Sequence, residues 1–191
     1  MSESKPVLTV IVASVRDGRK GRAVADWYIG EAEKHGGFEV RVADLKEVDL
    51  PLMTEPNHPR MKQYTQEKTW EWSRMIERSD AFAFVIPEYN HSLSAPVSNA
   101  IDYLSQEWGY KPAAIVCYGG VSGGHRAAQE LRTRLVALSV VSMPGLVALP
   151  SFGEHIKDDV FEGYDLANIA AKDSLDAMMK WHPALKSLRA S

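Results

Sequence analysis

The sequence predicts an α/β fold in which a doubly wound parallel sheet of five strands carries helices on both faces. Short apolar runs alternate with stretches of helical period five times along the chain, the pattern of a parallel sheet with crossover helices. Several of these runs are apolar throughout, as are strands buried on both faces. Three of them end in a polar or glycine-rich loop, and ligands of open α/β sheets bind at that edge.

Length and composition limit the classes of protein that this chain can be. Its 191 residues can bury a sizeable core and most simply form one domain, residues 1–191. The net charge of −3 argues against nucleic acids and anionic membranes as partners. The single cysteine excludes an intrachain disulfide and favours a reducing compartment. The apolar run 7–13 is too short for a membrane span, so we expect a cytoplasmic protein.

The chain begins with two strands joined by a helix. Val7–Ala13 is continuously apolar, and after a polar loop a helical period runs to His35-Gly36-Gly37, where glycine suits a helix end. Phe38–Leu45 alternates in polarity and is predicted to be a more exposed strand. The next segment, Leu45–Pro59, holds three prolines and is long for a connection. We therefore expect it to be a functional loop or a partner surface.

The centre of the chain combines a buried strand with a polar loop. Before it, Thr65–Ser79 is predicted to be an amphipathic helix, and its inner face would contain Trp72, Met75 and Ile76. Ala81–Ile86 is apolar and is predicted to end at Pro87, because proline cannot donate to a sheet ladder. A loop then runs to Ser92, and a helical period begins at Pro96.

The last third repeats the strand–loop–helix order. Ala113–Tyr118 is a buried strand, Gly119–Gly124 a glycine-rich loop, and His125–Leu138 a helix. A last strand is expected in two parts, 139–143 and 147–149, around Pro144-Gly145. The tail from about 160 to 191 is expected to be helical, with the period of residues 166–181 disrupted at Pro183.

Two of the loops have residues that suit a ligand. Ser14–Arg22 combines a hydroxyl, glycines and three arginines before a helix, which is suitable for an anion, although a basic surface turn has the same composition. Gly119–Gly124 lets a flat ligand approach the backbone, although a plain strand-to-helix turn would also contain glycine. It is not a Walker A loop, because His125 stands where the lysine would be. The G-x-G-x-x-G dinucleotide fingerprint is absent from the first loop.

Three motifs together resemble the NADPH-dependent FMN reductase family. They are Ser14-Val15-Arg16 after the first strand, Pro87-Glu88-Tyr89-Asn90 followed by Asn99-Ala100-Ile101-Asp102-Tyr103-Leu104, and the loop that ends in Gly123-Gly124. The resemblance covers about Val7 to Leu149, and its second motif is the specific one. It implies a flavodoxin-like fold, bound FMN, NADPH or NADH as co-substrate, and a small-molecule electron acceptor.

The resemblance also implies which residues hold FMN. The first loop would bind the phosphate, the second would meet the isoalloxazine ring, and the third would close over it. The expected cofactor-binding residues are Ser14, Arg16, Arg19, Gly21, Arg22, Pro87, Glu88, Tyr89, Asn90, His91, Tyr118, Gly119, Gly120 and Ser122. The chain departs from the family pattern at Ala13, where a glycine is usual, and at Arg19, where a second serine is frequent. No catalytic residue is expected, because the flavin itself carries out the hydride chemistry. No metal site is expected, because His91 and His125 have no second ligand at metal spacing.

Two alternatives and one assembly prediction complete the hypothesis. The alternatives are a flavodoxin-type electron carrier with a protein partner, and a flavin-free scaffold on the same fold. The family usually forms homodimers or homotetramers, and we expect at least a homodimer. Trp70 and Trp72 cannot share one helix face, so one of them should be exposed or at an interface. Trp108 and Tyr110 are further candidates for a partner surface.

Overall fold

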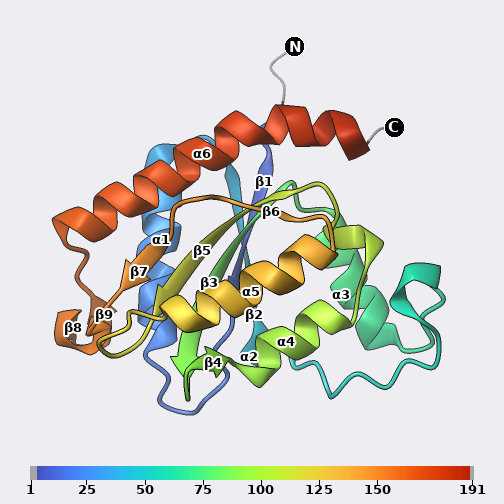
Figure 1. Cartoon of the computed structure of the whole chain (residues 1–191), viewed down its shortest axis with the longest axis horizontal. Helices are drawn as coiled ribbons and strands as arrows, with labels where there is room; N and C mark the ends of the chain where they lie inside the picture. The colour runs from blue at the N-terminus through green and yellow to red at the C-terminus, as the bar shows by residue number, and fades with distance from the viewer. Residues whose placement is uncertain (1–3, 190–191) are drawn as a thin grey trace.

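The computed structural model, which describes residues 4–189, has a central parallel sheet (Figure 1). Its strands are β1 (Val7–Val12), β2 (Glu39–Asp44), β3 (Ala81–Tyr89), β5 (Pro112–Tyr118) and a last strand in two parts, β6 (Val141–Ser142) and β7 (Val147–Leu149). They are ordered β2-β1-β3-β5-β6, all these pairs are parallel, and β7 also pairs with β5. This is the flavodoxin-like order, so the predicted fold class is confirmed.

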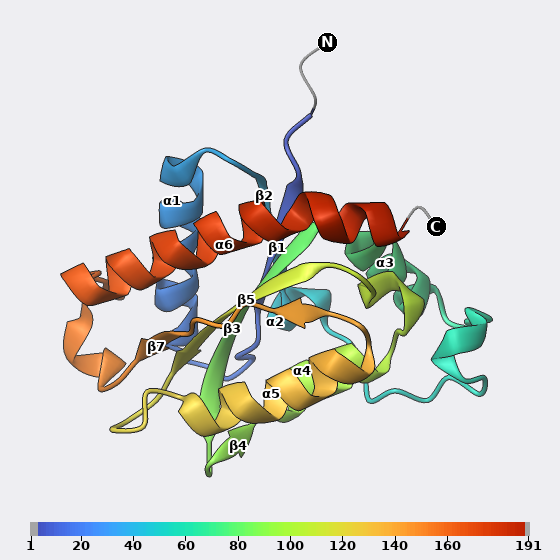
Figure 2. The ribbon, with the colours of Figure 1, turned by 45° about the horizontal axis from the view of Figure 1, so that its top comes forward.

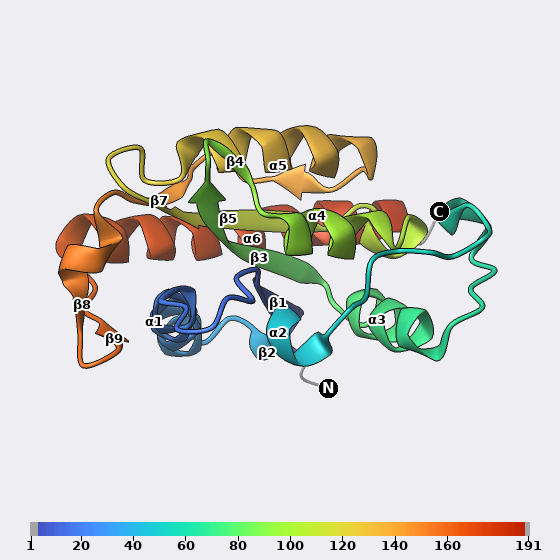
Figure 3. The ribbon, with the colours of Figure 1, turned by 90° about the horizontal axis from the view of Figure 1, so that it is seen from below.

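Helices cover both faces of the sheet. On one face lie α1 (Gly21–His35) and α6 (Asp165–Arg189), and on the other lie α3 (Glu67–Glu77), α4 (Ala95–Asp102) and α5 (His125–Ala137). Figure 2 shows the strands between α6 and the α4–α5 pair. Figure 3 shows α1 and α5 on opposite sides of the sheet. None of the helices in residues 4–189 is long and apolar enough to cross a membrane.

Short elements fill the connections. The proline-containing segment after β2 holds α2 (Leu45–Val48) and a 3₁₀ turn at Pro59–Met61. Further 3₁₀ turns form at Gln106–Trp108 and Phe152–His155. Two hairpins were not predicted. β4 (Ser92–Leu93) pairs antiparallel with the end of β3, and β8 (Ile156–Lys157) pairs antiparallel with β9 (Val160–Phe161).

The inner face of α3 and the place of Trp108 differ from the prediction. Trp72 and Ile76 are buried as expected, but Met75 is 38% exposed, and Thr69 and Ser73 share the buried face instead. This follows the helical period, which places residues 69, 72, 73 and 76 on one side. Trp108 is fully buried, and its ring centroid lies 6.0 Å from that of Trp72. Trp108 is therefore part of the core, and its proposed role at a partner surface is wrong.

The C-terminal helix does not end at Pro183. α6 continues to Arg189 because Pro183 faces solvent, where water can satisfy the carbonyl group that loses its intrahelical partner. The residues around the proline hold the helix in place. His182 and Leu185 are buried, and an Arg189 nitrogen lies 3.0 Å from Asp80 Oδ1. Tertiary packing thus outweighs the local cost of the proline.

Candidate functional site

The first loop leads from β1 into the N-terminus of α1. Ser14, 2% exposed, follows the strand, and α1 begins at Gly21. No described side chain caps this helix, and its first turn contains no acidic residue. The first N–H groups of an α-helix have no intrahelical partner and carry the positive end of its dipole. The loop therefore presents free donors to an anion at the carboxyl edge of the sheet.

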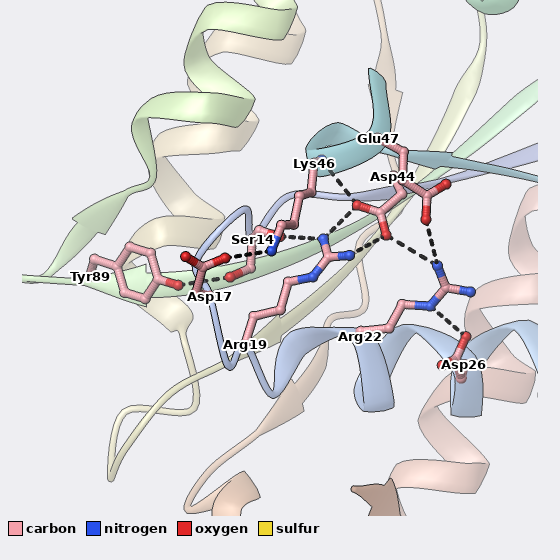
Figure 4. A network of polar contacts seen from close by, with 9 residues as sticks. All are labelled: Ser14, Asp17, Arg19, Arg22, Asp26, Asp44, Lys46, Glu47 and Tyr89. Atoms are coloured by element: carbon pink, nitrogen blue, oxygen red, sulfur yellow. Dashed lines mark hydrogen bonds and ion pairs between the residues drawn. The ribbon is translucent and has the colours of Figure 1, made fainter. Parts of the chain in front are cut away.

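The three arginines of this loop have different environments. Arg19 and Arg22 both donate to the buried carboxylate of Asp44, at the end of β2 (Figure 4). Arg16 is exposed and forms no ion pair with any described residue. Its guanidinium carbon lies 5.6 Å from the centroid of the Tyr89 ring. Arg16 is thus the arginine of the loop whose charge is available to a ligand.

Tyrosines at the ends of β3 and β5 reach the first loop. The hydroxyl groups of Ser14 and Tyr89 are 3.0 Å apart (Figure 4). The Tyr118 hydroxyl lies against Gly21, where an added Cβ would collide with it. Tyr118 is 4% exposed, and burial raises its pKa. Its hydroxyl has no hydrogen-bond partner among the described residues, and the nearby Ser14 hydroxyl lowers the pKa that burial raises.

The second loop is a strand end and a tight hairpin rather than an irregular loop. β3 continues through Pro87, which lies in register with Tyr118 of β5. Alternate residues of a strand face the same neighbour. The carbonyl of Val85 accepts a hydrogen bond from Ala13 N, so the backbone polar groups of Val85 face β1. Two residues later, the backbone nitrogen of Pro87 faces the same side, at a level where β1 has already ended. The missing N–H is not needed there, and the predicted strand end at Pro87 is wrong for this reason.

The hairpin turn consists of Asn90 and His91. Both have positive φ, 50° and 64°, the conformation that a two-residue turn of type I′ requires. Glu130 of α5 holds the returning strand, because its carboxylate accepts hydrogen bonds from Ser92 Oγ at 2.6 Å and Leu93 N at 2.8 Å. The exposed turn is therefore supported on a rigid base.

Glu88 connects the hairpin to the glycine-rich loop. Its side chain is 6% exposed and accepts hydrogen bonds from Ser122 Oγ at 2.8 Å, Arg126 N at 3.0 Å and Arg126 Nη1 at 3.0 Å. Burial would raise the pKa of Glu88, but these donors outweigh it and lower the pKa. A carboxylate so held at the N-terminus of α5 ties the hairpin to the glycine-rich loop.

The glycine-rich loop bends back over the end of β5. A Cβ added at Gly119 would lie 3.5 Å from Glu88 Cβ. The carbonyl oxygen of Gly120 accepts hydrogen bonds from the N–H groups of Gly123 and Ser151, at 3.0 Å each. Gly124 has a φ of 85°, and a Cβ there would lie 2.7 Å from Tyr118 N. Glycine is thus required at Gly124 by conformation and by space.

The structure brings the predicted residues together in two groups. Ser14, Gly21, Tyr89 and Tyr118 surround the end of β1, and Glu88 and Ser122 form the second group. Pro87, Asn90, His91, Gly119 and Gly120 line the same edge through β3, its hairpin and the turn after β5. Arg19 and Arg22 point instead to Asp44.

Three residues that shape this edge were not predicted from the sequence. They are Asp44, Glu130 and Phe152, whose ring centroid lies 4.7 Å from that of Tyr118. For Asp44 a signal existed, because a carboxylate at the end of a predicted parallel strand lies at the ligand-binding edge. Glu130 and Phe152 had no such signal, since their contacts join distant segments.

The residues of this edge fit FMN. An uncapped helix N-terminus with one unpaired arginine suits a phosphate. The buried hydroxyl of Tyr118 is a polar group that still needs a partner, and Gly21 leaves open the space beside it. Cys117 is buried, and burial raises the pKa of its thiol to about 12. No group of His, Cys, Asp and Glu within residues 4–189 could hold a metal ion.

Comparisons with known proteins agree with the resemblance. The family model described as NADPH-dependent FMN reductase matches residues 6–154. An NAD(P)H-dependent FMN reductase of Nectria is 35% identical over 150 residues, which are 75% of this chain and 74% of that protein. A quinone reductase of Pseudomonas putida is 38% identical over 143 residues, 71% of this chain and 73% of that protein.

A further relative and a solved structure complete the comparison. An NAD(P)H-dependent FMN reductase of Schizosaccharomyces pombe is 39% identical over 126 residues, 65% of this chain and 63% of that protein. The flavoenzyme NAD(P)H:(acceptor) oxidoreductase FerB of Paracoccus denitrificans has a TM-score of 0.73 at 23% identity, over 94% of this chain and 98% of that chain. This last likeness concerns the fold. On the matched length and the identities of its relatives, the chain belongs to the NADPH-dependent FMN reductase family, the FMN-dependent oxidoreductases that use NAD(P)H.

Proposed function

We propose that the FMN phosphate binds at the loop Ser14–Arg22 and that the isoalloxazine ring lies between residues 87–91 and 118–122. The observation that carries this proposal is the buried, unpartnered Tyr118 hydroxyl beside Gly21 at an uncapped helix N-terminus. An unsatisfied buried hydroxyl is costly unless a ligand completes it. Arg16 supplies a charge for the phosphate, since Arg19 and Arg22 are already paired with Asp44.

Bound FMN supplies the chemistry, by accepting a hydride from NAD(P)H and giving the electrons to an acceptor. The protein binds and orients it. Backbone amides of the hairpin and of the glycine-rich loop can donate to the ring edge. Glu88 holds these two segments together by accepting a hydrogen bond from Ser122. Tyr89 is held by the Ser14 hydroxyl and would border the ring. No side chain of this edge is required to act as an acid, base or nucleophile.

The acceptor is proposed to be a small molecule such as a quinone, a free flavin, or a nitro or azo compound. The name of the Pseudomonas putida relative, quinone reductase, supports this, as does that of an NADPH azoreductase of Bacillus that is 29% identical over 153 residues. The sheet and loops can cover only one face and the rim of the ring. Nicotinamide and acceptor should then use the other face in turn, which predicts ping-pong kinetics. Intersecting initial-rate lines would contradict the shared face.

The experiment that tests this function is a flavin titration followed by an acceptor screen. Apoprotein is titrated with FMN, and NADH and NADPH oxidation is then followed by absorbance with each acceptor class. A reductase binds FMN and oxidises NAD(P)H directly. An electron carrier would bind FMN without oxidising NAD(P)H, and a scaffold would bind no flavin, so each alternative has its own outcome.

We also propose that the protein is cytoplasmic and forms a homodimer or a homotetramer. Trp108 no longer supports an interface, and Trp70 is half-buried because Tyr64 packs against it at 5.0 Å between ring centroids. The remaining support is the family resemblance, together with two exposed residues, Leu52 at 79% and Tyr110 at 45%. Light scattering at micromolar concentration tests the proposal, and a monomer would contradict it.

A further inference from the structure

We propose that Asp44 is a positioning residue for the FMN phosphate. It holds Arg19 and Arg22 so that the first loop has its phosphate-binding shape before the cofactor arrives. This inference rests on the FMN site proposed above and assigns Arg19 a different role from the one that the family resemblance implied. In this view Arg19 shapes the loop, and the backbone N–H groups and Arg16 meet the phosphate.

The geometry places Asp44 at the centre of a network that ties three segments together (Figure 4). Its side chain is fully buried. One carboxylate oxygen accepts from Arg19 Nη1 at 2.5 Å and from Lys46 N at 3.1 Å, and the other accepts from Arg19 Nη2 at 2.6 Å and Arg22 Nη1 at 3.1 Å. The bidentate pair fixes the orientation of Arg19, since its planar fork matches the carboxylate.

Arg19 in turn fixes the path of the loop. Its Nη1 donates to the carbonyl of Ser14 at 2.7 Å as well as to Asp44, so the exit of β1 is tied to the end of β2. Arg22 adds a tie from the first turn of α1. A third tie joins Lys46 Nζ to Asp17 Oδ1 at 2.7 Å. With these contacts made, the side chain of Arg19 is only 13% exposed, and its guanidinium has few donors left for a phosphate.

Electrostatic repulsion alone predicts that Asp44 weakens FMN binding, whereas a positioning role predicts that Asp44 strengthens it. Burial would raise the pKa of Asp44, but hydrogen bonds from Arg19, Lys46 N and Arg22 outweigh it and lower the pKa, so the group is ionised at neutral pH. An ionised carboxylate close to the phosphate loop repels a phosphate dianion. Removing its charge would therefore strengthen FMN binding if Coulomb attraction decided the affinity, and weaken it if loop shape decides.

The experiment compares FMN with riboflavin, which has the same ring and lacks the phosphate, by quenching of flavin fluorescence. For Asp44→Asn we expect the Kd for FMN to rise about tenfold, the size of a coupling within one polar network. The Kd for riboflavin should stay within about twofold. An unchanged or lower Kd for FMN would overturn the inference, and so would an equal loss of both ligands, which indicates a general structural defect.

Asp26→Asn is the matched charge control. Asp26 also accepts from Arg22, at 2.8 Å from its Nε, but is 54% exposed and does not contact Arg19. It removes one negative charge from the same neighbourhood, so its FMN affinity should be unchanged or slightly higher. A loss equal to that of Asp44→Asn would refute the positioning role.

Arg19→Lys provides the second test and serves if Asp44→Asn does not fold, because it keeps the positive charge and loses the planar fork that matches the Asp44 carboxylate. Its Kd for FMN should rise as that of Asp44→Asn does, and an unchanged Kd would overturn the inference. Because both residues act through the same pair, the double variant should bind FMN no more weakly than the weaker single variant. Additive losses would mean that Arg19 contacts the phosphate itself and would overturn the inference. If wild-type apoprotein binds FMN no better than riboflavin, the proposed phosphate site fails, and the role of Asp44 fails with it.

Discussion

Tyr118→Phe separates stability from cofactor binding at the proposed site. The hydroxyl of Tyr118 is buried and has no hydrogen-bond partner among the described residues. Leaving such a group unsatisfied costs about 1–3 kcal/mol, so its removal should raise the free energy of unfolding of the apoprotein. We expect a gain of about 1 kcal/mol, or about 2–4 °C in Tm for a chain of this length.

The same change should weaken FMN binding. A hydrogen bond to a charged group contributes about 1.5–3 kcal/mol, so the Kd for FMN should rise about tenfold or more if the hydroxyl donates to the phosphate. Urea unfolding of the apoprotein and fluorescence titration with FMN measure the two effects separately. A more stable apoprotein with weaker FMN binding is the expected combination.

Tyr28→Phe is the matched control. Tyr28 is also fully buried, but its hydroxyl lies 2.8 Å from Ser174 Oγ. Removing a satisfied hydroxyl should lower the free energy of unfolding by about 1 kcal/mol and leave FMN binding unchanged. If Tyr118→Phe destabilises the apoprotein as Tyr28→Phe does, the Tyr118 hydroxyl is already satisfied and the reasoning fails. An unchanged Kd for FMN would remove this hydroxyl from the cofactor site.

Three further predictions concern the same edge of the sheet. Arg16→Ala should weaken FMN binding by about 1.5–3 kcal/mol, and unchanged affinity with intact folding would place the phosphate elsewhere. Substitutions at Tyr89 or His91 should alter acceptor turnover more than the anaerobic half-reaction with NAD(P)H, which stopped-flow absorbance distinguishes. Glu88→Gln should lower the free energy of unfolding by about 1–3 kcal/mol at pH 7. Because the folded pKa of Glu88 lies below its unfolded value, that stabilisation is present above about pH 4.5 and is lost as the pH falls through the folded pKa. Urea titrations from pH 7 to pH 3 should therefore show the two proteins converging, and a constant difference would contradict the assignment.

The alternation of apolar runs and helical periods in the sequence was enough to predict the fold class, and it put the proposed site at one edge of the sheet. Runs such as Ala81–Ile86 are apolar at every position, and only a strand covered on both faces buries them fully. Loops that follow such strands must meet at one edge of a parallel sheet. The meeting of the three loops at one edge could therefore be predicted from the sequence, and the motif Pro87-Glu88-Tyr89-Asn90 indicated the family.

Tertiary structure decided the features that depend on what lies opposite a residue. Pro87 continues a strand because β1 has ended beside it, and Pro183 stays in a helix because it faces solvent. Trp108 is core because Trp72 and Phe82 enclose it. A local pattern reports the preferences of one segment, whereas these outcomes depend on its neighbours in space.

The arginines of the first loop are the clearest case. In the sequence, Arg16, Arg19 and Arg22 are equivalent positive charges before a helix. In the structure, Asp44, 25 residues beyond Arg19, pairs with two of them and leaves Arg16 available. A charge pair forms where two side chains are close and shielded from water. Only the folded chain sets that distance and that burial, so the sequence determined that the loop is basic, and the structure decided which arginine can meet a ligand.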